Sequence, residues 1–107
     1  MSDFYCEEVL NGKTPVDVVR ETEYTLAFRH TRPAYPVHIV VIPKKHIESL
    51  LTVCEADRPW IEDLLRVPQD VAGEVKREQG AAKIITNLGS YQDSKHLHVH
   101  VVCLAKK

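Results

Sequence analysis

The sequence predicts an α+β fold in which a mostly antiparallel five-stranded sheet is covered by one main helix. Three patterns lead to this prediction. The run "VHIVVIP" at 37–43 is apolar and β-branched, as in a central strand. Residues from about 57 to 79 carry apolar side chains at spacings of three and four, the period of an amphipathic helix. Residues 96–101 alternate strictly between histidine and an apolar residue, as in a strand with two different faces.

The first half of the chain is expected to supply three strands. The segments 16–21 and 24–29 are strand-like and are separated by a short polar turn, which predicts a hairpin. A proline-rich loop, "RPAYP" at 32–36, leads into the central strand 37–43, which ends at its own proline. The following residues 44–51, "KKHIESLL", favour a short helical turn.

The second half is expected to contain the main helix and two more strands. Pro59 suits the first helical turn, and Gly80 suits the C-terminal cap. Pro68 removes an internal hydrogen bond, and we therefore expect a kink or break near Val67. The run "AAKIITN" at 81–87 predicts the fourth strand, and the histidine run predicts the last.

Length and composition fit a single domain spanning residues 1–107. The 14 Lys and Arg residues and 15 Asp and Glu residues give a formal net charge of -1 without a basic stripe, so we expect no nucleic-acid partner. The opening residues lack the basic start and apolar run of a signal peptide, and the longest apolar stretch is too short to span a bilayer. We therefore expect a cytoplasmic protein with no membrane partner.

The alternation at 96–101 puts His96, His98 and His100 on one face of the predicted strand, roughly 7 Å apart along it. The apolar residues between them point the other way and can pack on a core. Three imidazoles side by side in a plain core would lose hydration without compensation, which favours a functional cluster around a small ligand. His46, by contrast, is interpreted as a surface residue.

The stretch "HLHVHVV" resembles the signature of the histidine triad (HIT) family, in which three histidines alternate with apolar residues. "TLAFRHTRPAYPVHIVVIPKKHIESL" resembles the HINT-branch segment that contains an earlier site histidine and a Pro-Lys-Lys-His turn, and "IITNLGS" resembles the strand and glycine loop before the triad. The resemblance covers residues from about 4 to 102. It implies the HIT α+β fold and a homodimer whose two sheets join into one.

The resemblance also implies catalytic roles. His98 matches the family's nucleophile, with His96 and His100 beside it, and His38 matches the earlier site histidine. The implied activity is hydrolysis or transfer at the α-phosphate of a nucleotide conjugate, such as a phosphoramidate, through a nucleotidyl intermediate on His98. The implied partner is therefore a small nucleotide-like substrate.

A second group of residues is expected to contact the substrate. Asn87 matches the family's asparagine near the phosphate, and Gly89 and Ser90 belong to a loop whose backbone amides can approach an anion. His30 stands where the family has a ribose-binding aspartate, and a histidine accepts at most one hydrogen bond. Asp93 replaces the serine or threonine found three positions before the triad.

Imidazole chemistry supports the catalytic assignment independently of the resemblance. A neutral imidazole can attack phosphorus when its other nitrogen is fixed as N–H by a hydrogen bond. His96, His100 and loop amides can neutralise the transition-state oxygens, so the predicted reaction needs neither a cofactor nor a metal. The proton for the leaving group is expected from His38 or Ser94.

Metal binding is the main alternative. Two triad histidines at i and i+2, completed by His38, would resemble a catalytic zinc site with three nitrogen ligands. Asp3 and Cys6 stand where some family members carry a zinc-binding cysteine pair; because Cys54 and Cys103 are distant and no CxxC pair exists, structural zinc is not expected. Two further functions stay open, a dinucleoside polyphosphate hydrolase and a dimeric nucleotide- or metal-binding module without turnover.

Overall fold

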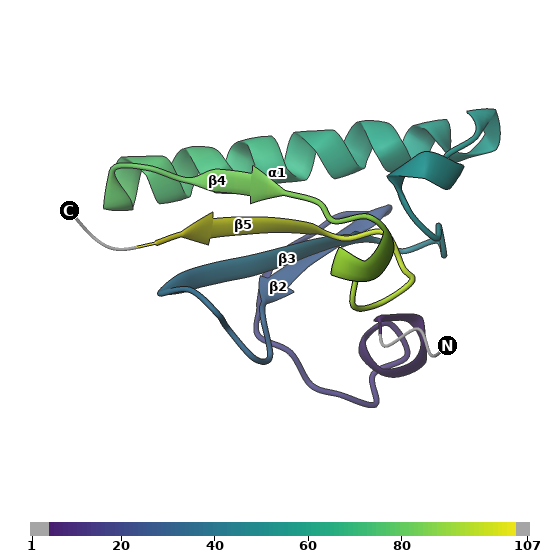
Figure 1. The fold of residues 1–107 in the computed structure, drawn as a ribbon, viewed down its shortest axis with the longest axis horizontal. Helices are drawn as coiled ribbons and strands as arrows, with labels where there is room; N and C mark the ends of the chain where they lie inside the picture. The colour runs from purple at the N-terminus through teal and green to yellow at the C-terminus, as the bar shows by residue number, and fades with distance from the viewer. Residues whose placement is uncertain (1–4, 105–107) are drawn as a thin grey trace.

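The computed structural model describes residues 5–104, and it shows the α+β fold that the sequence predicts. Five strands form one sheet in the order β1-β2-β3-β5-β4, and every neighbouring pair is antiparallel. Helix α1 spans Arg58–Gln79 and lies across one face of the sheet (Figure 1). The strands are β1 Val18–Glu21, β2 Thr25–Arg29, β3 Val37–Pro43, β4 Lys83–Ile85 and β5 Val99–Cys103.

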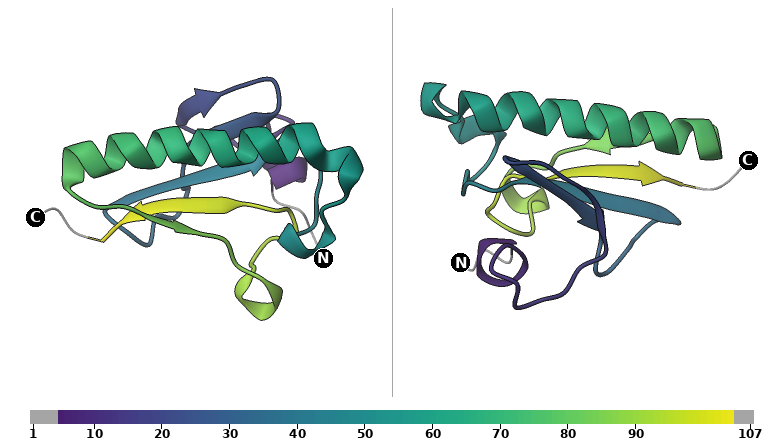
Figure 2. Two further views of the ribbon diagram at one scale, coloured as in Figure 1. Left: turned by 90° about the horizontal axis from the view of Figure 1, so that it is seen from above. Right: turned by 180° about the vertical axis from the view of Figure 1, so that it is seen from behind.

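The sheet separates two apolar clusters. Ile39 and Val41 of β3 belong to the cluster beneath α1, whereas Val40 and Ile42 pack with the helical turn Tyr5–Val9. This alternation follows from the two-residue period of a strand. Figure 1 and the right view of Figure 2 show α1 and the N-terminal turn on opposite sides of the sheet. Even-numbered side chains of β3 therefore point away from α1.

Of the kink or break expected near Val67, the break does not form, because helix α1 is continuous through Pro68. A proline inside a helix costs about 3 kcal/mol. Burial of Leu64, Val67 and Val71 against the sheet outweighs that cost, because each such side chain contributes about 1.5–3 kcal/mol. The helix ends as predicted at Gly80, whose φ of 96° is left-handed.

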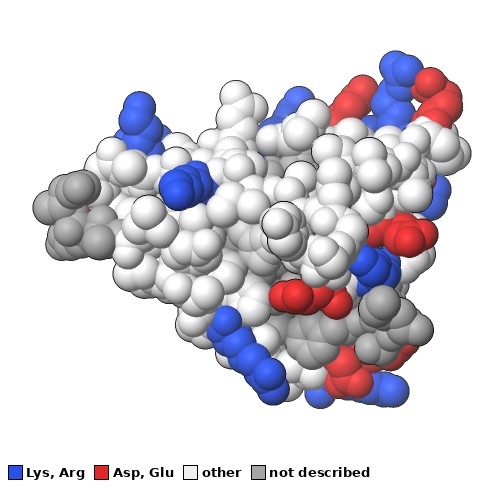
Figure 3. All heavy atoms as spheres, in the orientation of Figure 1, with Lys and Arg blue, Asp and Glu red and all other residues white. Residues whose placement is uncertain are grey.

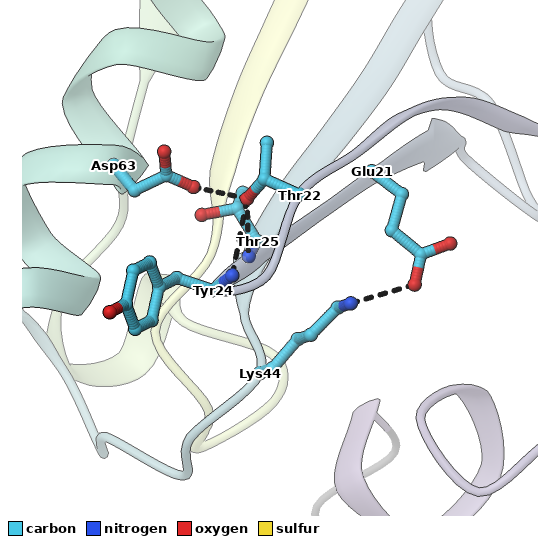
Figure 4. A network of polar contacts seen from close by, with 6 residues as sticks. All are labelled: Glu21, Thr22, Tyr24, Thr25, Lys44 and Asp63. Carbon is cyan, nitrogen blue, oxygen red and sulfur yellow. Dashed lines mark hydrogen bonds and ion pairs between the residues drawn. The ribbon is translucent and has the colours of Figure 1, made fainter.

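The turn of the β1–β2 hairpin is hydrogen-bonded to α1 (Figure 4). The Thr22 hydroxyl donates to the Asp63 carboxylate of α1. The same oxygen accepts the backbone N–H groups of Tyr24 and Thr25, at 3.2 and 3.0 Å. The predicted hairpin is confirmed, although its two strands begin slightly later than the sequence pattern suggests.

Two shorter elements differ from the prediction in extent. The helical turn expected within 44–51 forms only at the end of that range, as the 3-10 turn Leu50–Thr52 capped by Ser49. Strand β4 covers only the middle of the predicted run 81–87. Neither difference changes the topology.

Within residues 5–104, no helix combines the length and the apolar character that crossing a membrane requires. On the face shown in Figure 3, Lys and Arg side chains are scattered among acidic ones and form no continuous basic stripe.

Candidate active site

Strand β5 begins at Val99, so only His100 of the three triad histidines lies within a strand, and the strand expected from His96 starts later. The antiparallel register of β3 and β5 would bring Leu97 opposite Pro43. Because proline has no N–H to donate, the hydrogen-bond ladder ends there. The residues just before β5 are thus released from the sheet, and their polar groups can make other bonds.

The ring of His98 is held in one tautomer. Its Nδ1–H donates to the backbone carbonyl of His96 at 2.7 Å, since a carbonyl oxygen can only accept. In the neutral ring, the lone pair is then on Nε2. Burial lowers the pKa of His98 below its ordinary value of 6.5, so the ring is neutral at pH 7. This is the protonation state that a nucleophilic imidazole needs.

His96 supports His98 without lining the cavity beside it. Its ring is fully buried, and its Nε2–H donates to the carbonyl of Pro43 at 2.9 Å. Its Nδ1 faces the Sγ of Cys6 at 3.3 Å, and the Tyr5 ring packs against its edge. The group that His96 contributes to the site is therefore its backbone carbonyl.

His38 and His100 form a directed pair. The backbone N–H of Ala34 donates to Nδ1 of His38 at 3.0 Å, so the proton of the neutral ring is on Nε2. That Nε2–H donates to Nδ1 of His100 at 2.8 Å, which leaves the N–H of His100 on its own Nε2. Burial, reinforced by neighbouring imidazoles, lowers the pKa of each ring to about 4. Both rings are neutral at pH 7.

His30 joins this pair by stacking. Its ring lies on that of His38 with 4.2 Å between centroids and 26° between planes. The backbone N–H of Arg32 donates to Nδ1 of His30 at 2.9 Å, so a neutral ring carries its proton on Nε2. Burial lowers the pKa of His30 below 6.5. His30 therefore offers the site a donor and no free acceptor.

A cavity of about 370 Å³ lies beside His98, His100 and His30, whereas His38 does not line it. His98 and His100 line it together with Asp93 and Ser94 from the preceding loop and with residues 30–32. The Ser94 hydroxyl oxygen is buried and has no hydrogen-bond partner among the described residues. The cavity lining thus includes both the predicted nucleophile and a residue whose hydroxyl group is unused. Its apolar lining comes from Tyr5 and Phe28.

Asn87, Gly89 and Ser90 do not line this cavity. Gly89 has a left-handed φ of 63° and starts the short turn Gly89–Tyr91. Its carbonyl accepts from the Nζ of Lys95 at 2.9 Å. The expected contact of these three residues with a substrate phosphate stays a prediction.

A second cluster is one that sequence reasoning missed. Cys6, His46 and His96 each offer a ligand atom, and these atoms lie within 4.8 Å of one another. His46 is exposed, as predicted, but its Nδ1 is 3.9 Å from the Sγ of Cys6. Asp3, the other residue considered for this region, lies outside the described residues. The signal in the sequence is the position of Cys6, where some family members carry a zinc-binding cysteine, and nothing in the sequence links His46 or His96 to it.

The ring nitrogens of His30, His38 and His100 also lie within 4.8 Å of one another. A metal-bound neutral imidazole normally donates the N–H of its other nitrogen to an acceptor. In His38 and His30 that arrangement is blocked, because Nδ1 already accepts a backbone N–H from Ala34 or Arg32. Binding a metal through either nitrogen would break this hydrogen bond or set two N–H groups against each other. This cluster fits a hydrogen-bonded relay better than a metal site.

Comparisons with known proteins agree with the fold and the triad. Residues 4–107 match the family described as scavenger mRNA decapping enzyme C-term binding. An uncharacterised HIT-like protein of Azospirillum brasilense is 38% identical over 100 residues, which cover 87% of this chain and 79% of that protein.

Three solved structures share the fold. A HIT family hydrolase from Legionella pneumophila has a TM-score of 0.82 and 29% identity, covering 95% of this chain and 92% of that one. A hypothetical histidine triad nucleotide-binding protein from Sulfolobus tokodaii has a TM-score of 0.81 and 27% identity, covering 96% and 69%. A zinc-bound histidine triad family protein from Mycobacterium smegmatis has a TM-score of 0.83 and 26% identity, covering 98% and 76%. The fold of the present chain, its three alternating histidines and these similarities show that it belongs to the histidine triad (HIT) family.

Proposed function

We propose that this protein hydrolyses nucleotide conjugates at the α-phosphate, through a covalent intermediate on Nε2 of His98. The proposal rests above all on the 2.7 Å hydrogen bond from Nδ1–H of His98 to the His96 carbonyl, which leaves the lone pair on Nε2. The names of the Legionella and Sulfolobus relatives support a hydrolase and a nucleotide, respectively. The resemblance to the HINT branch favours a phosphoramidate, in which a phosphorus–nitrogen bond breaks.

The proposed reaction has two steps. Nε2 of His98 attacks phosphorus, a nitrogen–phosphorus bond forms, and the bond to the leaving amine breaks as that amine takes up a proton. We assign the proton donor to Ser94, because this residue lies in the cavity lining and its buried hydroxyl has no hydrogen-bond partner among the described residues. Water then attacks phosphorus, the bond to His98 breaks, and a proton returns to Ser94.

We assign to His100, supported by His38, the role of stabilising the transition state. The N–H of His100 is on Nε2 because its Nδ1 accepts from His38. A neutral N–H held at a fixed angle stabilises the charge that develops on the phosphate oxygens. His38 acts through His100, by holding that ring in the donating tautomer.

The cavity also suits a nucleoside. Its volume of about 370 Å³ lies within the range of small-molecule sites. Tyr5 and Phe28 supply apolar lining, and their ring centroids are 6.0 Å apart. A base packed on these rings would leave the α-phosphate for His98.

The proposal is tested with nucleoside 5′-phosphoramidates and His98→Ala. Loss of the nucleophile should lower kcat/KM by about a thousandfold or more. Rapid quenching of the wild-type reaction should trap one nucleotidyl group on His98, read by mass spectrometry of the peptide. Wild-type-like turnover in His98→Ala would refute the nucleophile.

A second candidate is cleavage of a phosphoanhydride in a dinucleoside polyphosphate, which the decapping-enzyme description of the matching family favours. The same histidine chemistry applies, with a phosphate in place of the amine as leaving group. Including dinucleoside polyphosphates in the substrate panel separates the two. A higher kcat/KM for these than for any phosphoramidate would favour the second candidate.

We also propose a homodimer joined through strand β4. Among the residues that the structure describes, this strand pairs only with β5 and leaves its other edge open, and Ile84 on it is 56% exposed. Ile84→Lys should convert a dimer to a monomer in light scattering. Leu65→Lys, on the exposed side of α1, is the matched control and should stay dimeric. A monomeric wild-type protein would contradict the proposal.

A structural metal site is proposed at Cys6, His46 and His96, contrary to the expectation from sequence. The Nε2–H of His96 donates to the Pro43 carbonyl, so its Nδ1 lone pair is directed at the cluster, as in metal-bound histidines. Sulfur and imidazole ligands suit zinc, and the Mycobacterium relative is zinc-bound.

The metal proposal is tested by zinc content and thermal unfolding. Wild-type protein should bind one zinc ion and gain melting temperature from it. Cys6→Ala should lose most of both effects, while Cys54→Ala, a change at an exposed thiol elsewhere, should keep them. Equal zinc binding in the two variants would contradict the site.

A further inference from the structure

Asp93 is a charged residue that the proposed mechanism does not use. Its side chain lines the cavity together with His98, and it is exposed to solvent. Its negative charge opposes the burial that lowers the pKa of His30, so its field reaches that ring. A carboxylate in the same cavity as the nucleophile is unexpected, because its negative charge repels the phosphate that the nucleophile has to attack.

No cation of the described residues neutralises Asp93. The neighbouring ammonium of Lys95 donates instead to the carbonyls of Gly89 and Gln92, at 2.9 and 3.4 Å. Arg32 is the other charged residue of the cavity lining, and it makes no ion pair with Asp93. The cavity therefore offers two separate charges, a cation suited to the phosphate and an anion with no ion-pair partner among residues 5–104.

The unpaired carboxylate affects substrates according to their charge. It repels a phosphate and any anionic leaving group, such as a nucleoside polyphosphate. It attracts a positive charge that a substrate brings into the cavity. For an exposed carboxylate several ångströms away, the difference amounts to about three- to tenfold in kcat/KM and is weakened by salt.

We propose that Asp93 selects phosphoramidates whose leaving amine carries a second, protonated amino group, as conjugates of diamines and basic amino acids do. This inference rests on the proposed function, whose chemistry it leaves unchanged. The phosphorus–nitrogen bond breaks, the departing nitrogen takes one proton, and the distant ammonium stays charged throughout.

The test compares two conjugates of one nucleoside 5′-phosphate, with 1,4-diaminobutane and with butylamine. They differ chiefly in one terminal ammonium group. The ratio of their kcat/KM values is measured for wild type, Asp93→Asn and Asp93→Lys. Asp17→Asn is the matched control, because Asp17 is exposed and pairs with Arg29 away from the cavity.

Wild type should prefer the diamine conjugate by about three- to tenfold at low salt, and less at high salt. The preference should disappear in Asp93→Asn, reverse in Asp93→Lys and persist in Asp17→Asn. Turnover of both conjugates at equal rates by wild type, or a preference unchanged in Asp93→Asn, would overturn this inference alone. Absence of turnover and of any adduct on His98 would overturn the proposed function and this inference with it.

Discussion

At the scale of single residues, backbone groups rather than carboxylates determine which ring nitrogen of His98 and of His38 carries the proton. The His96 carbonyl accepts from His98, and the Ala34 N–H donates to His38. A peptide group does not titrate near neutral pH, so each ring keeps one tautomer across that range. Substitutions of other side chains that leave the backbone in place should therefore preserve the tautomers of His98 and His38.

Folding stability should fall on acidification. The pKa of His38 and of His100 is about 4 in the folded protein, because burial and neighbouring imidazoles disfavour the charged rings, against an ordinary 6.5. Between pH 6.5 and 4 the unfolded chain therefore binds more protons, and the free energy of unfolding decreases as pH falls. Urea unfolding should give its highest midpoint above pH 6.5. A variant with Gln at both positions should show a shallower pH dependence, and an unchanged slope would contradict this origin.

Ser94 offers a way to separate catalysis from stability. Its hydroxyl is buried without a hydrogen-bond partner among the described residues, so Ser94→Ala removes no bond and should leave the melting temperature unchanged or slightly higher. Loss of the proton donor should lower kcat by about a hundredfold for amines that leave poorly. Asp17→Asn, a change at an exposed residue that does not line the cavity, should alter neither quantity by much. A large loss of stability in Ser94→Ala would contradict its assignment.

At the scale of elements, the pairing of β3 with β5 brings His38 and His100 together. The register sets His38 opposite Val102 and His100 opposite Val40, so the two histidines are diagonal neighbours on one face. Diagonal neighbours are within reach when the side chains carry rings. A slip of one residue would turn a histidine into the apolar cluster beneath α1, so the core that stabilises the sheet also maintains this contact.

Replacing the glycine inside α1 and the glycine at its C-terminal cap by alanine should change the free energy of unfolding in opposite directions. Gly80 has a φ of 96°, and the position of an added Cβ is open, so Gly80→Ala should cost about 1 kcal/mol through backbone strain alone. Gly73 lies inside the helix, where an added Cβ would make only an ordinary contact with Arg77, and Gly73→Ala should gain about 0.5–1 kcal/mol. Chemical denaturation measures both. If both variants changed the free energy of unfolding in the same direction, the left-handed cap at Gly80 would be contradicted.

At the scale of the whole molecule, the sheet keeps its two apolar clusters apart. Val71 of α1 packs in one cluster, and Val9 of the N-terminal turn packs in the other. Each change to alanine should lower the free energy of unfolding by about 2 kcal/mol. The double variant should lose the sum to within about 0.5 kcal/mol, because the sites share no partner. A larger departure in chemical denaturation would show that the sheet transmits strain between its faces.

The parts of the molecule that were predictable from sequence are those with a local period. The apolar spacing of 57–79 and the β-branched run 37–43 lead directly to α1 and β3, and the alternation around His98 indicates the candidate site. A break near Val67, one of the two outcomes expected there, does not occur, because packing against the sheet outweighs the local effect of Pro68.

Contacts between distant residues carry no such local signal. Cys6 lies 40 positions from His46 and 90 from His96, and only the folded sheet brings the three together. Whether Ser94 faces the cavity likewise depends on a loop conformation that no sequence pattern specifies.

The hydrogen-bond chain from Ala34 through His38 to His100 starts at a peptide N–H, which does not release its proton under physiological conditions. The chain therefore cannot be replenished from the interior of the protein. Any proton that His100 gives up has to be restored through the same opening by which substrate enters. A bound substrate that closes this opening would isolate His38 and His100 from bulk water. His100 could then regain a lost proton only after the product leaves.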